Sequence, residues 1–565
     1  MARPTRSSPA ISRGLFRVGR HWLTSGLCLG LLAVVLVLPL LALVVEAIRQ
    51  PTAWRVWLEV DRLAGLAGRS LLLAAAVVAA VMPPATFLGW LLFRTNLPGR
   101  HWAQVLFLFA LVLPIAVTVC GWVLFWQWIG APMRVEPGWR FLAAVGLHAV
   151  IALPLATLAS GLGFTWVEPE LEEEGWLAGG PWRTFWRVTW PRTRPARWCA
   201  ALLVALGVWQ EITITDLFSV RTWAEEVYVE FNSGAEATSR AVAACLPPVL
   251  LLVLLSLLAW RGLWRHQSPW VTWQRPALVW DLGARRGPGA RWRIGLAAWL
   301  GLLLALTPGL FLPLVGLIHA AGRGGDGWSM SQLGARLGRQ VSVSGPLLVD
   351  SLVLGAVVGL STALAAIAAL WWARSQPGRP VWLGRLAVLL WAMPGPLLGL
   401  AVLEAILWLL DFPGGAWLRP ALWDGPSLVP NVWVQWLRFL PLALAVLAPL
   451  AALVPRTWEE EVRLSGAGPW PRFWLGFGRP LLGPTIWAAL LVSLFSLGEL
   501  SASKLVTTPG SLPLVQHLFM QMHAAADAEV ASLALVLLLT VAGIGLAALL
   551  PLRRLKNPCM PWVGR

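Results

Sequence analysis

Three glutamates lie inside apolar stretches of the chain, where a charged side chain is costly. Glu211, Glu404 and Glu499 each sit in a run of apolar residues long enough to cross a bilayer. A carboxylate at membrane depth usually faces a cavity or a partner group, so it is a candidate for a solute path. Thr213 follows the first of them and Ser501 the last. We expect Glu211, Thr213, Glu499 and Ser501 to flank a path across the membrane; the alternative is that each glutamate caps or bonds a neighbouring helix end.

The sequence offers no pattern for covalent catalysis, nucleotide binding or a resident metal. Its five cysteines form no C-x-x-C pair, and its acidic residues and histidines do not cluster at metal-ligand spacing. Leu505 follows Lys504 and Asn557 follows Lys556, so neither lysine fits the phosphate-binding loop G-x-x-x-x-G-K-[ST]. We therefore expect no metal site, no cofactor bound by this chain and no enzymatic activity.

The composition places these glutamates in a polytopic all-α membrane protein. Of 565 residues, 58% are hydrophobic and 13% are charged, whereas a soluble domain has about a quarter charged residues. A soluble enzyme, a disordered scaffold and a disulfide-rich secreted module are excluded on this ground. About twelve apolar runs reach membrane-spanning length. They cover residues 22–48, 70–93, 102–131, 139–164, 196–218, 240–260, 294–320, 346–373, 386–410, 430–454, 485–506 and 528–552.

The basic residues indicate the orientation of these runs. Five arginines precede the first run, which is too long for a cleaved signal peptide, so the first helix is expected to remain and to begin in the cytoplasm. With twelve spans, most Lys and Arg then fall on the cytoplasmic side, as the positive-inside rule requires, and both termini are cytoplasmic. The net charge of +17 is thereby explained without nucleic acid as a partner. The 39 tryptophans suit contacts with membrane lipid at headgroup level.

Two polar stretches interrupt the apolar runs in the same way. One begins at Glu172 and the other at Glu459; each has three glutamates, then glycines, then Pro-Trp and a later Phe-Trp. Glu211 and Glu499, 288 residues apart, follow in matching helices. This pattern predicts two parallel six-helix repeats. The predicted parts are a first domain (1–263), a linker on the cytoplasmic side (264–293) and a second domain (294–565).

Each polar stretch predicts a helix–turn–helix elbow between the fourth and fifth helices of its repeat, at about 168–195 and 455–484. The glutamates suit the positive end of a short helix, glycine ends that helix, and proline begins the next one. Tryptophan then supplies an anchor at the membrane surface. The residues concerned are Glu173, Gly179, Pro181 and Trp182, and Glu460, Gly466, Pro469 and Trp470.

At these residues the chain resembles the membrane subunit of ATP-binding-cassette importers. The cytoplasmic loop of that family reads E-A-A-x-x-x-G and is followed by L-P. Glu173 with Gly179, and Glu460 with Gly466, occupy the Glu and Gly positions of that motif. The two alanines are replaced in both copies, and only the proline of L-P is kept.

The resemblance implies a function and partners. Two such loops in one chain are similar to the fused permeases that import ferric iron, as are the segments 496–503 and 523–530. It implies an extracytoplasmic solute-binding protein, and a cytoplasmic ATPase dimer that carries ATP and Mg²⁺ and receives both loops as coupling helices. The location implied is a bacterial inner membrane.

Other functions remain open at this point. Fused permeases for thiamine, phosphonate or polyamine are similar to the iron permeases. A secondary transporter of the major-facilitator type also has twelve spans in two parallel repeats, but it would carry an acidic motif between its second and third spans. A membrane-embedded transferase would need a cluster of carboxylates or histidines at one membrane face. The acidic runs at Glu172 and Glu459 are the only candidates for such a cluster, and their repetition favours docking.

Overall fold

A computed structural model describes residues 34–130, 136–232, 237–264, 280, 288–325, 327–374, 379–524 and 527–552. Within these ranges the chain is helical, apart from one short antiparallel pair of strands, β1 (Arg323–Gly324) and β2 (Gly327–Trp328). The predicted helical membrane fold is thereby confirmed.

The N-terminal part of the described chain ends at residue 264. Its helices are Val34–Arg49, η1 (Pro51–Leu58), α2 (Val60–Arg94), α3 (Arg100–Val112), α4 (Ile115–Trp128), α5 (Pro137–Thr165), α6 (Pro169–Thr184), the π-helical turn η2 (Phe185–Thr189), α7 (Trp190–Arg192), α8 (Arg194–Gln210), α9 (Thr213–Leu217), α10 (Trp223–Phe231) and α11 (Ala237–Trp264).

The C-terminal part begins at residue 288. Its helices are α12 (Pro288–Leu306), η4 (Thr307–Phe311), α13 (Leu312–Gly322), α14 (Met330–Arg374), α15 (Arg379–Ala392), α16 (Gly395–Asp411), η5 (Gly415–Leu418), η6 (Pro420–Asp424), α17 (Val429–Leu453), α18 (Arg456–Leu464), α19 (Pro469–Phe473), η7 (Trp474–Gly478), α20 (Arg479–Leu497), η8 (Ser503–Leu505), α21 (Leu514–Ala524) and α22 (Asp527–Leu552).

The described chain has fewer straight spans than the twelve predicted. Eight helices are long and apolar enough to cross a membrane, or eleven spans are present if each of three sharply bent helix pairs counts as one. The bent pairs are Val34–Arg49 with η1 (79°), α3 with α4 (91°) and α15 with α16 (102°). The α3–α4 bend therefore breaks a run, 102–131, that the sequence suggested as one continuous helix.

Proline explains two of these breaks. Pro114 and Pro394 directly precede α4 and α16, and proline disfavours helical backbone at the residue before it. The prediction of a continuous helix over 102–131 was therefore wrong. The proline pairs at 83–84 and 247–248, in contrast, lie inside α2 and α11.

The predicted span 196–218 is also shorter than expected. Helix α8 ends at Gln210 after 17 residues, and Glu211 has extended backbone angles (φ −83°, ψ 131°). The break lies at the carboxylate that interrupts the apolar run. A separate short helix, α9, follows.

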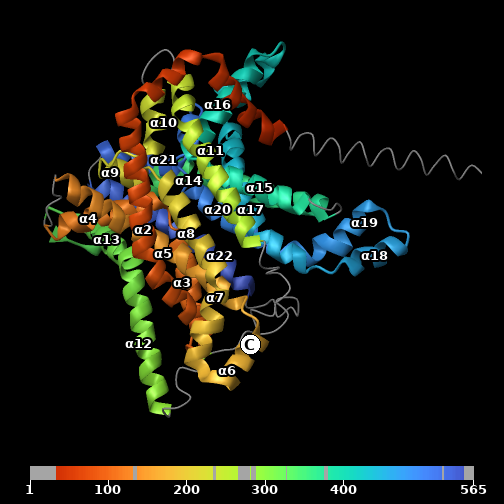
Figure 1. The fold of residues 1–565 in the computed structure, drawn as a ribbon. Coiled ribbons are helices and arrows are strands. Elements are labelled where there is room, and N and C mark those ends of the chain that lie inside the picture. Colours follow the sequence, from red (N-terminus) through yellow and green to blue (C-terminus); the bar gives the residue numbers. More distant parts are fainter. Residues whose placement is uncertain are drawn as a thin grey trace, which may run out of the picture.

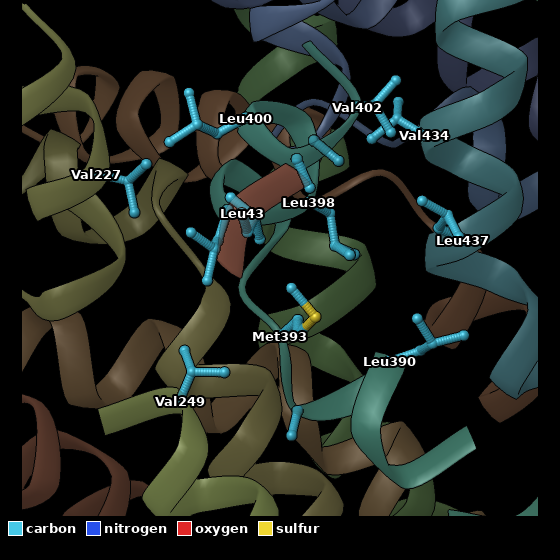
Figure 2. Close-up of a cluster of buried hydrophobic side chains, with 14 of the residues drawn as sticks. Leu43, Val227, Val249, Leu390, Met393, Leu398, Leu400, Val402, Val434 and Leu437 are labelled. Carbon is cyan, nitrogen blue, oxygen red and sulfur yellow. The ribbon is translucent and has the colours of Figure 1, made fainter. Parts of the chain in front are cut away.

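The largest apolar core lies between the two parts of the chain. Figure 2 shows Leu43, Val227 and Val249 from the N-terminal part close to Leu398 and Val402 of α16, and all five side chains are buried in one cluster. Fully burying such a side chain contributes about 1.5–3 kcal/mol in water, and less where lipid is the competing solvent. The two parts are therefore packed as one body.

Small residues bring α4 and α13 close together across the same junction. A Cβ atom at Gly121 would come within 2.5 Å of the Pro313 carbonyl oxygen, and one at Gly316 within 2.3 Å of the Gly121 carbonyl oxygen. Close backbone approach at small residues is the usual way in which membrane helices associate, because van der Waals packing replaces the hydrophobic driving force.

The helices of the two elbows and the short helices α9, α10 and α21 lie in different regions of the molecule. Figure 1 shows α6 and α7 toward the bottom of the view and α18 and α19 at its right, whereas α9, α10 and α21 lie toward the upper left. The elbow helices thus lie away from the short helices that follow α8 and α20.

Charged residues join α2, α10 and α11 at one end of the bundle. The buried Glu230 carboxylate binds Arg62 Nη2 at 2.5 Å and Arg240 Nε at 2.8 Å. Burial opposes ionisation of this carboxyl, but the hydrogen bonds from Arg240 and Arg62 outweigh it, so the pKa of Glu230 lies below its ordinary value. A lowered pKa means that the pairing stabilises the fold at neutral pH and that this stability is lost as the pH falls through the lowered pKa.

Glu230→Gln tests this coupling. We expect the substitution to lower stability at pH 7 by about 1–3 kcal/mol and to weaken the loss of stability between about pH 5 and pH 3. The measurement is the melting temperature of the full chain in detergent as a function of pH. Glu59→Gln, at an exposed partner of Arg62, is the control and should change little. An unchanged acid profile for Glu230→Gln would contradict the assignment.

Candidate functional site: two helical elbows and a central polar network

The first elbow turns at a single glycine. Helix α6 runs from Pro169, and Gly180 interrupts it with a left-handed backbone angle (φ 77°) before Pro181 begins the next turns. Glycine adopts this conformation without the penalty of a Cβ atom. The chain continues through η2 and α7 into α8. The helix–glycine–proline–helix order expected over 168–195 is present.

The second elbow has the same order with a longer connection. Helix α18 ends at Leu464, Gly466 is left-handed (φ 76°), and α19 begins at Pro469. The π-helical turn η7 then leads into α20, as η2 leads toward α8. A left-handed glycine therefore lies at the turn of both elbows, directly before the proline in the first and three residues before it in the second.

A buried ion pair fixes the first elbow to the end of α2. Arg94 and Glu172 are fully buried and directly paired, and the Thr189 hydroxyl donates to the other oxygen of Glu172 at 2.5 Å. Glu172 therefore connects α2, α6 and η2. Removing one member of a buried pair typically costs about 3–5 kcal/mol, because the other charge is left uncompensated.

The second elbow is fixed in the same way to the end of α14. Arg374 pairs with the buried Glu459 of α18, and it also donates to the carbonyl oxygens of Ala451 (3.0 Å) and Val454 (2.5 Å). Arg374 thereby joins α14, α17 and α18. In each part of the chain, the arginine that ends a long core helix holds the first glutamate of the acidic triplet.

The predicted elbow residues lie on the exposed side of this arrangement. Glu173 and Glu460, the glutamates that match the family motif, are exposed next to their buried neighbours. Trp182 and Trp470 are 69% and 70% exposed, and Gly179, Gly466 and Pro469 are also exposed, whereas Pro181 is half-buried. Each elbow also has an exposed leucine just before its turn, Leu177 and Leu464. Both elbows therefore expose apolar side chains next to their turns.

Sequence reasoning did not identify the two arginines or the role of the first glutamates. A signal was available, because Arg94 and Arg374 are each the first charged residue after a long apolar run. What the sequence does not show is a contact between residues that lie 78 and 85 positions apart.

Glu211 and Glu499 lie where two helices break, as the capping alternative proposed. The Glu211 carboxylate accepts the backbone N–H groups of Thr213 (2.6 Å) and Ile214 (2.8 Å). The Glu499 carboxylate accepts the Ala502 N–H and the Ser501 hydroxyl, both at 2.8 Å. Each carboxylate therefore satisfies backbone or hydroxyl donors that a broken helix leaves free.

A basic or imidazole side chain faces each of these carboxylates. His148 Nε2 lies 3.5 Å from Glu211, and Arg438 Nε lies 3.7 Å from Glu499. His148 also bonds the Ala144 carbonyl oxygen through Nδ1 at 2.8 Å. The two sites are alike in geometry and differ in charge, because His148 can be neutral and Arg438 cannot.

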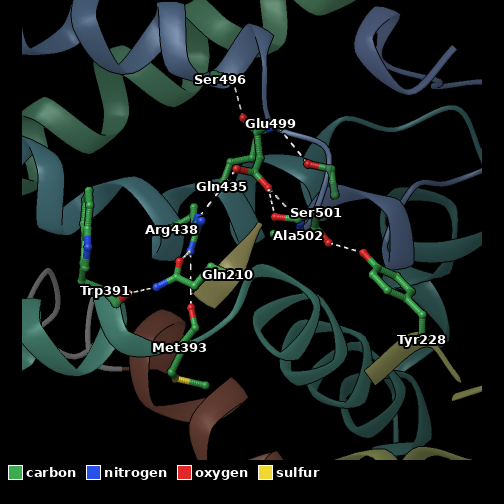
Figure 3. A network of polar contacts seen from close by, with 11 residues as sticks. Gln210, Tyr228, Trp391, Met393, Gln435, Arg438, Ser496, Glu499, Ser501 and Ala502 are labelled. Carbon is green, nitrogen blue, oxygen red and sulfur yellow. Dashed lines mark hydrogen bonds and ion pairs between the residues drawn. The ribbon is translucent and has the colours of Figure 1, made fainter. Parts of the chain in front are cut away.

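Arg438 connects the breaks of both parts. Figure 3 shows its guanidinium group between Gln210, the last residue of α8, and Glu499; Nη1 bonds Gln210 and lies 3.3 Å from the Met393 carbonyl oxygen. The Gln210 amide in turn donates to the Trp391 carbonyl oxygen. One side chain of α17 thus touches the end of α8, the α15–α16 bend and the break after α20.

Further hydrogen bonds extend this network into the C-terminal part. Gln435, one turn before Arg438, donates to the Ser503 hydroxyl at 3.0 Å and accepts from the Ser496 hydroxyl. The Tyr228 hydroxyl donates to the Ser501 carbonyl oxygen at 2.5 Å. Sequence reasoning missed Arg438 and Gln435, although their spacing of three places them on one face of a helix.

The other candidates from the sequence lie outside this network. Thr213 lines a shallow groove between the two parts, together with Asp216, Phe519 and His523. Glu404 is buried in α16 and shares a hydrogen bond with Thr238 at the start of α11. In the ranges that the structure describes, no three His, Cys, Asp or Glu side chains gather closely enough to hold a metal ion.

The fold and these sites define a multi-pass helical membrane protein with two elbows and a polar centre. A comparison with curated proteins finds that the chain is similar to the Fe(3+)-transport system permease protein FbpB 2 of Haemophilus influenzae. The two are 24% identical over 346 residues, which cover 60% of this chain and 63% of the relative. No family model and no solved structure matches the chain. The resemblance to importer permeases that the elbow motifs predicted is thus confirmed at the level of distant homology.

The two buried ion pairs are expected to respond differently to apolar replacement. Arg94→Met with Glu172→Leu should retain more stability than Arg374→Met with Glu459→Leu, because Arg374 also satisfies two carbonyl groups, whereas Arg94 has two buried nitrogen atoms, Nε and Nη1, without a hydrogen-bond partner. Each single arginine substitution should cost about 3–5 kcal/mol. Melting temperatures in detergent measure both effects. Equal losses in the two double variants would contradict this interpretation.

The two helix-break glutamates are also expected to differ. Glu499→Gln should lower stability by about 1–3 kcal/mol, because it leaves Arg438 without its carboxylate. Glu211→Gln should cost less, because an imidazole, unlike a guanidinium group, does not have to carry a charge, and a glutamine oxygen can still accept a backbone N–H. The comparison is made by thermal unfolding at pH 8. If Glu211→Gln lost more stability than Glu499→Gln, the charge of Arg438 would not be what makes the carboxylate at 499 important for stability.

Proposed function

We propose that the chain is the membrane permease of an ATP-binding-cassette importer and that its two elbows couple it to a separate ATPase. The observation that carries this proposal is that each elbow is exposed on one side and fixed on the other by a buried arginine–glutamate pair. An element held this way moves together with the long helix to which it is fixed. A partner that pulls on an elbow would therefore move α2 or α14.

The surface that meets the ATPase is proposed to be the exposed part of each elbow. It consists of Glu173, Gly179, Pro181 and Trp182 in the first elbow and Glu460, Gly466, Pro469 and Trp470 in the second. Two similar elbows suit a dimer of ATPase subunits, each of which would receive one. ATP and Mg²⁺ would bind to that dimer, and the permease itself would need no cofactor.

The solute path is proposed to run through the polar centre between two permease domains, 1–263 and 294–565. Glu211, Thr213, Glu499 and Ser501 lie at or next to the helix breaks there. Broken helices in a bilayer are tolerated where they line a cavity or are buried in protein, and transporters commonly place their substrate sites at them. A solute-binding protein would deliver the solute from outside a bacterial inner membrane, with both termini and the linker 264–293 in the cytoplasm.

The solute is proposed to be ferric iron, on the basis of the name of the relative and the segments 496–503 and 523–530. Thiamine, phosphonate and polyamine are the alternatives within the same class of importer. Uptake of each radiolabelled solute by cells with and without the chain would separate them.

The coupling proposal predicts that the exposed tryptophans hold the ATPase. Trp182→Glu with Trp470→Glu should abolish copurification of an ATPase with the tagged chain from its native membrane, because two charges replace apolar contacts. Mass spectrometry after gentle detergent extraction identifies the subunits that come down with each variant.

Trp417→Glu is a matched control for this experiment. Trp417 is 77% exposed and lies in η5, which follows α16, so its substitution should leave the ATPase bound. If the wild-type chain brings down no ATPase, the importer proposal is wrong, and transport driven by an ion gradient becomes the function to test.

A further inference from the structure

A residue between α11 and α12 is attached to the first elbow. Trp280 N–H donates to the Arg94 carbonyl oxygen at 2.7 Å, and Asn96 N–H donates to the Trp280 carbonyl oxygen at 3.1 Å. These bonds form a parallel bridge between Trp280 and Thr95, immediately after α2 ends. The segment that joins the two parts of the chain is therefore bound, at this residue, to the end of a core helix.

The Trp280 side chain sits among three aromatic rings of the first elbow and its supporting helix. Ring centroids lie 5.9 Å from Trp90 of α2, 5.6 Å from Trp176 of α6 and 5.8 Å from Phe185 of η2. The interplanar angles of 77°, 83° and 85° are edge-to-face arrangements. Such pairs stabilise the arrangement beyond the area that they bury.

The contacts of Trp280 and the buried ion pair of the same elbow share one residue, Arg94. The Arg94 carbonyl oxygen accepts from Trp280, and the Arg94 side chain binds Glu172. The position of α6 is thus determined by its ion pair with Arg94 of α2 and by the ring of Trp280, which lies in the sequence between the two parts of the chain. Both depend on the backbone at the end of α2.

The second elbow is built from its own rings. Trp371 of α14 contacts Phe473 of α19 at 5.5 Å and Phe477 of η7 at 5.3 Å, and Trp470 contacts Phe473 at 5.6 Å. Trp371 lies three residues before Arg374, much as Trp90 lies four residues before Arg94, so each tryptophan is close to the arginine that ends its helix. The two elbows therefore have similar ion pairs but different aromatic support.

We propose that Trp280 is a positioning residue for the first elbow, so that the connection between the two permease domains sets how α6 is presented to the ATPase. The proposal rests on the coupling function proposed above. It makes the two elbows inequivalent, because among the residues that the structure describes only the first elbow receives a ring from the connection.

The test compares Trp280→Ala in two backgrounds that each leave one elbow able to bind. Leu464→Arg places a charge on the exposed face of the second elbow, and Leu177→Arg does so on the first; neither leucine takes part in the ring cluster. Binding is measured as the amount of ATPase that copurifies with the full chain. In the Leu464→Arg background, Trp280→Ala should weaken capture about tenfold, which corresponds to one or two aromatic pairs. In the Leu177→Arg background it should change nothing further.

Two additions distinguish positioning from a general role in folding. Trp280→Phe retains edge-to-face contacts and both backbone bonds, so it should restore most of the capture lost in Trp280→Ala. Hydrogen exchange of the free chain in detergent should become faster in α6 and stay unchanged in α18. Equal losses of capture in both backgrounds, or unchanged exchange in α6, would overturn the proposal. Absence of ATPase from the wild-type chain would instead contradict the importer function.

Discussion

The structure depends on the requirement that backbone polar groups in a bilayer find partners within the protein. Long helices meet this requirement by themselves, but α8 and α20 stop inside the predicted membrane region. At each stop a glutamate supplies the missing acceptors, Glu211 for the start of α9 and Glu499 for the turn that contains Ala502. A carboxylate can do this only if its charge is also tolerated, which explains why His148 and Arg438 face the two sites. The polar centre follows from the broken helices.

The same reasoning explains how the elbows are held in place. A buried arginine needs several acceptors, and the end of a helix offers free carbonyl groups together with the glutamate of the next element. Arg374 uses Glu459 and the carbonyl groups of Ala451 and Val454, so three helices meet at one guanidinium group. Arg94 has fewer partners, and there the aromatic rings around Trp280 add support. The two elbows reach a similar geometry by different means.

The features that the sequence predicted well are those with a local cause. Glycine and proline order predicted both elbows, because left-handed backbone and a missing N–H act within a few residues. The apolar runs predicted the helical fold for a similar reason. The break at Pro114 was missed because the residues on both sides of it are equally apolar, so hydropathy carries no sign of a 91° bend. The contact of Arg438 with Gln210, 228 positions away, has no local signature at all.

Arg438 shows what alternating access would have to overcome in the proposed permease. Its partners come from α8 in one part of the chain, and from the α15–α16 bend and the break after α20 in the other. If α2 and α14 move with their elbows, the helices packed on them shift, and the contacts of Arg438 are among the polar contacts across the junction that must rearrange. A guanidinium group can exchange one acceptor for another without losing its charge, so a solute carrying oxygen ligands could replace Gln210 or Glu499 as its partner. The contact of Arg438 with Gln210, which joins the two parts, would then be one with which the passing solute competes.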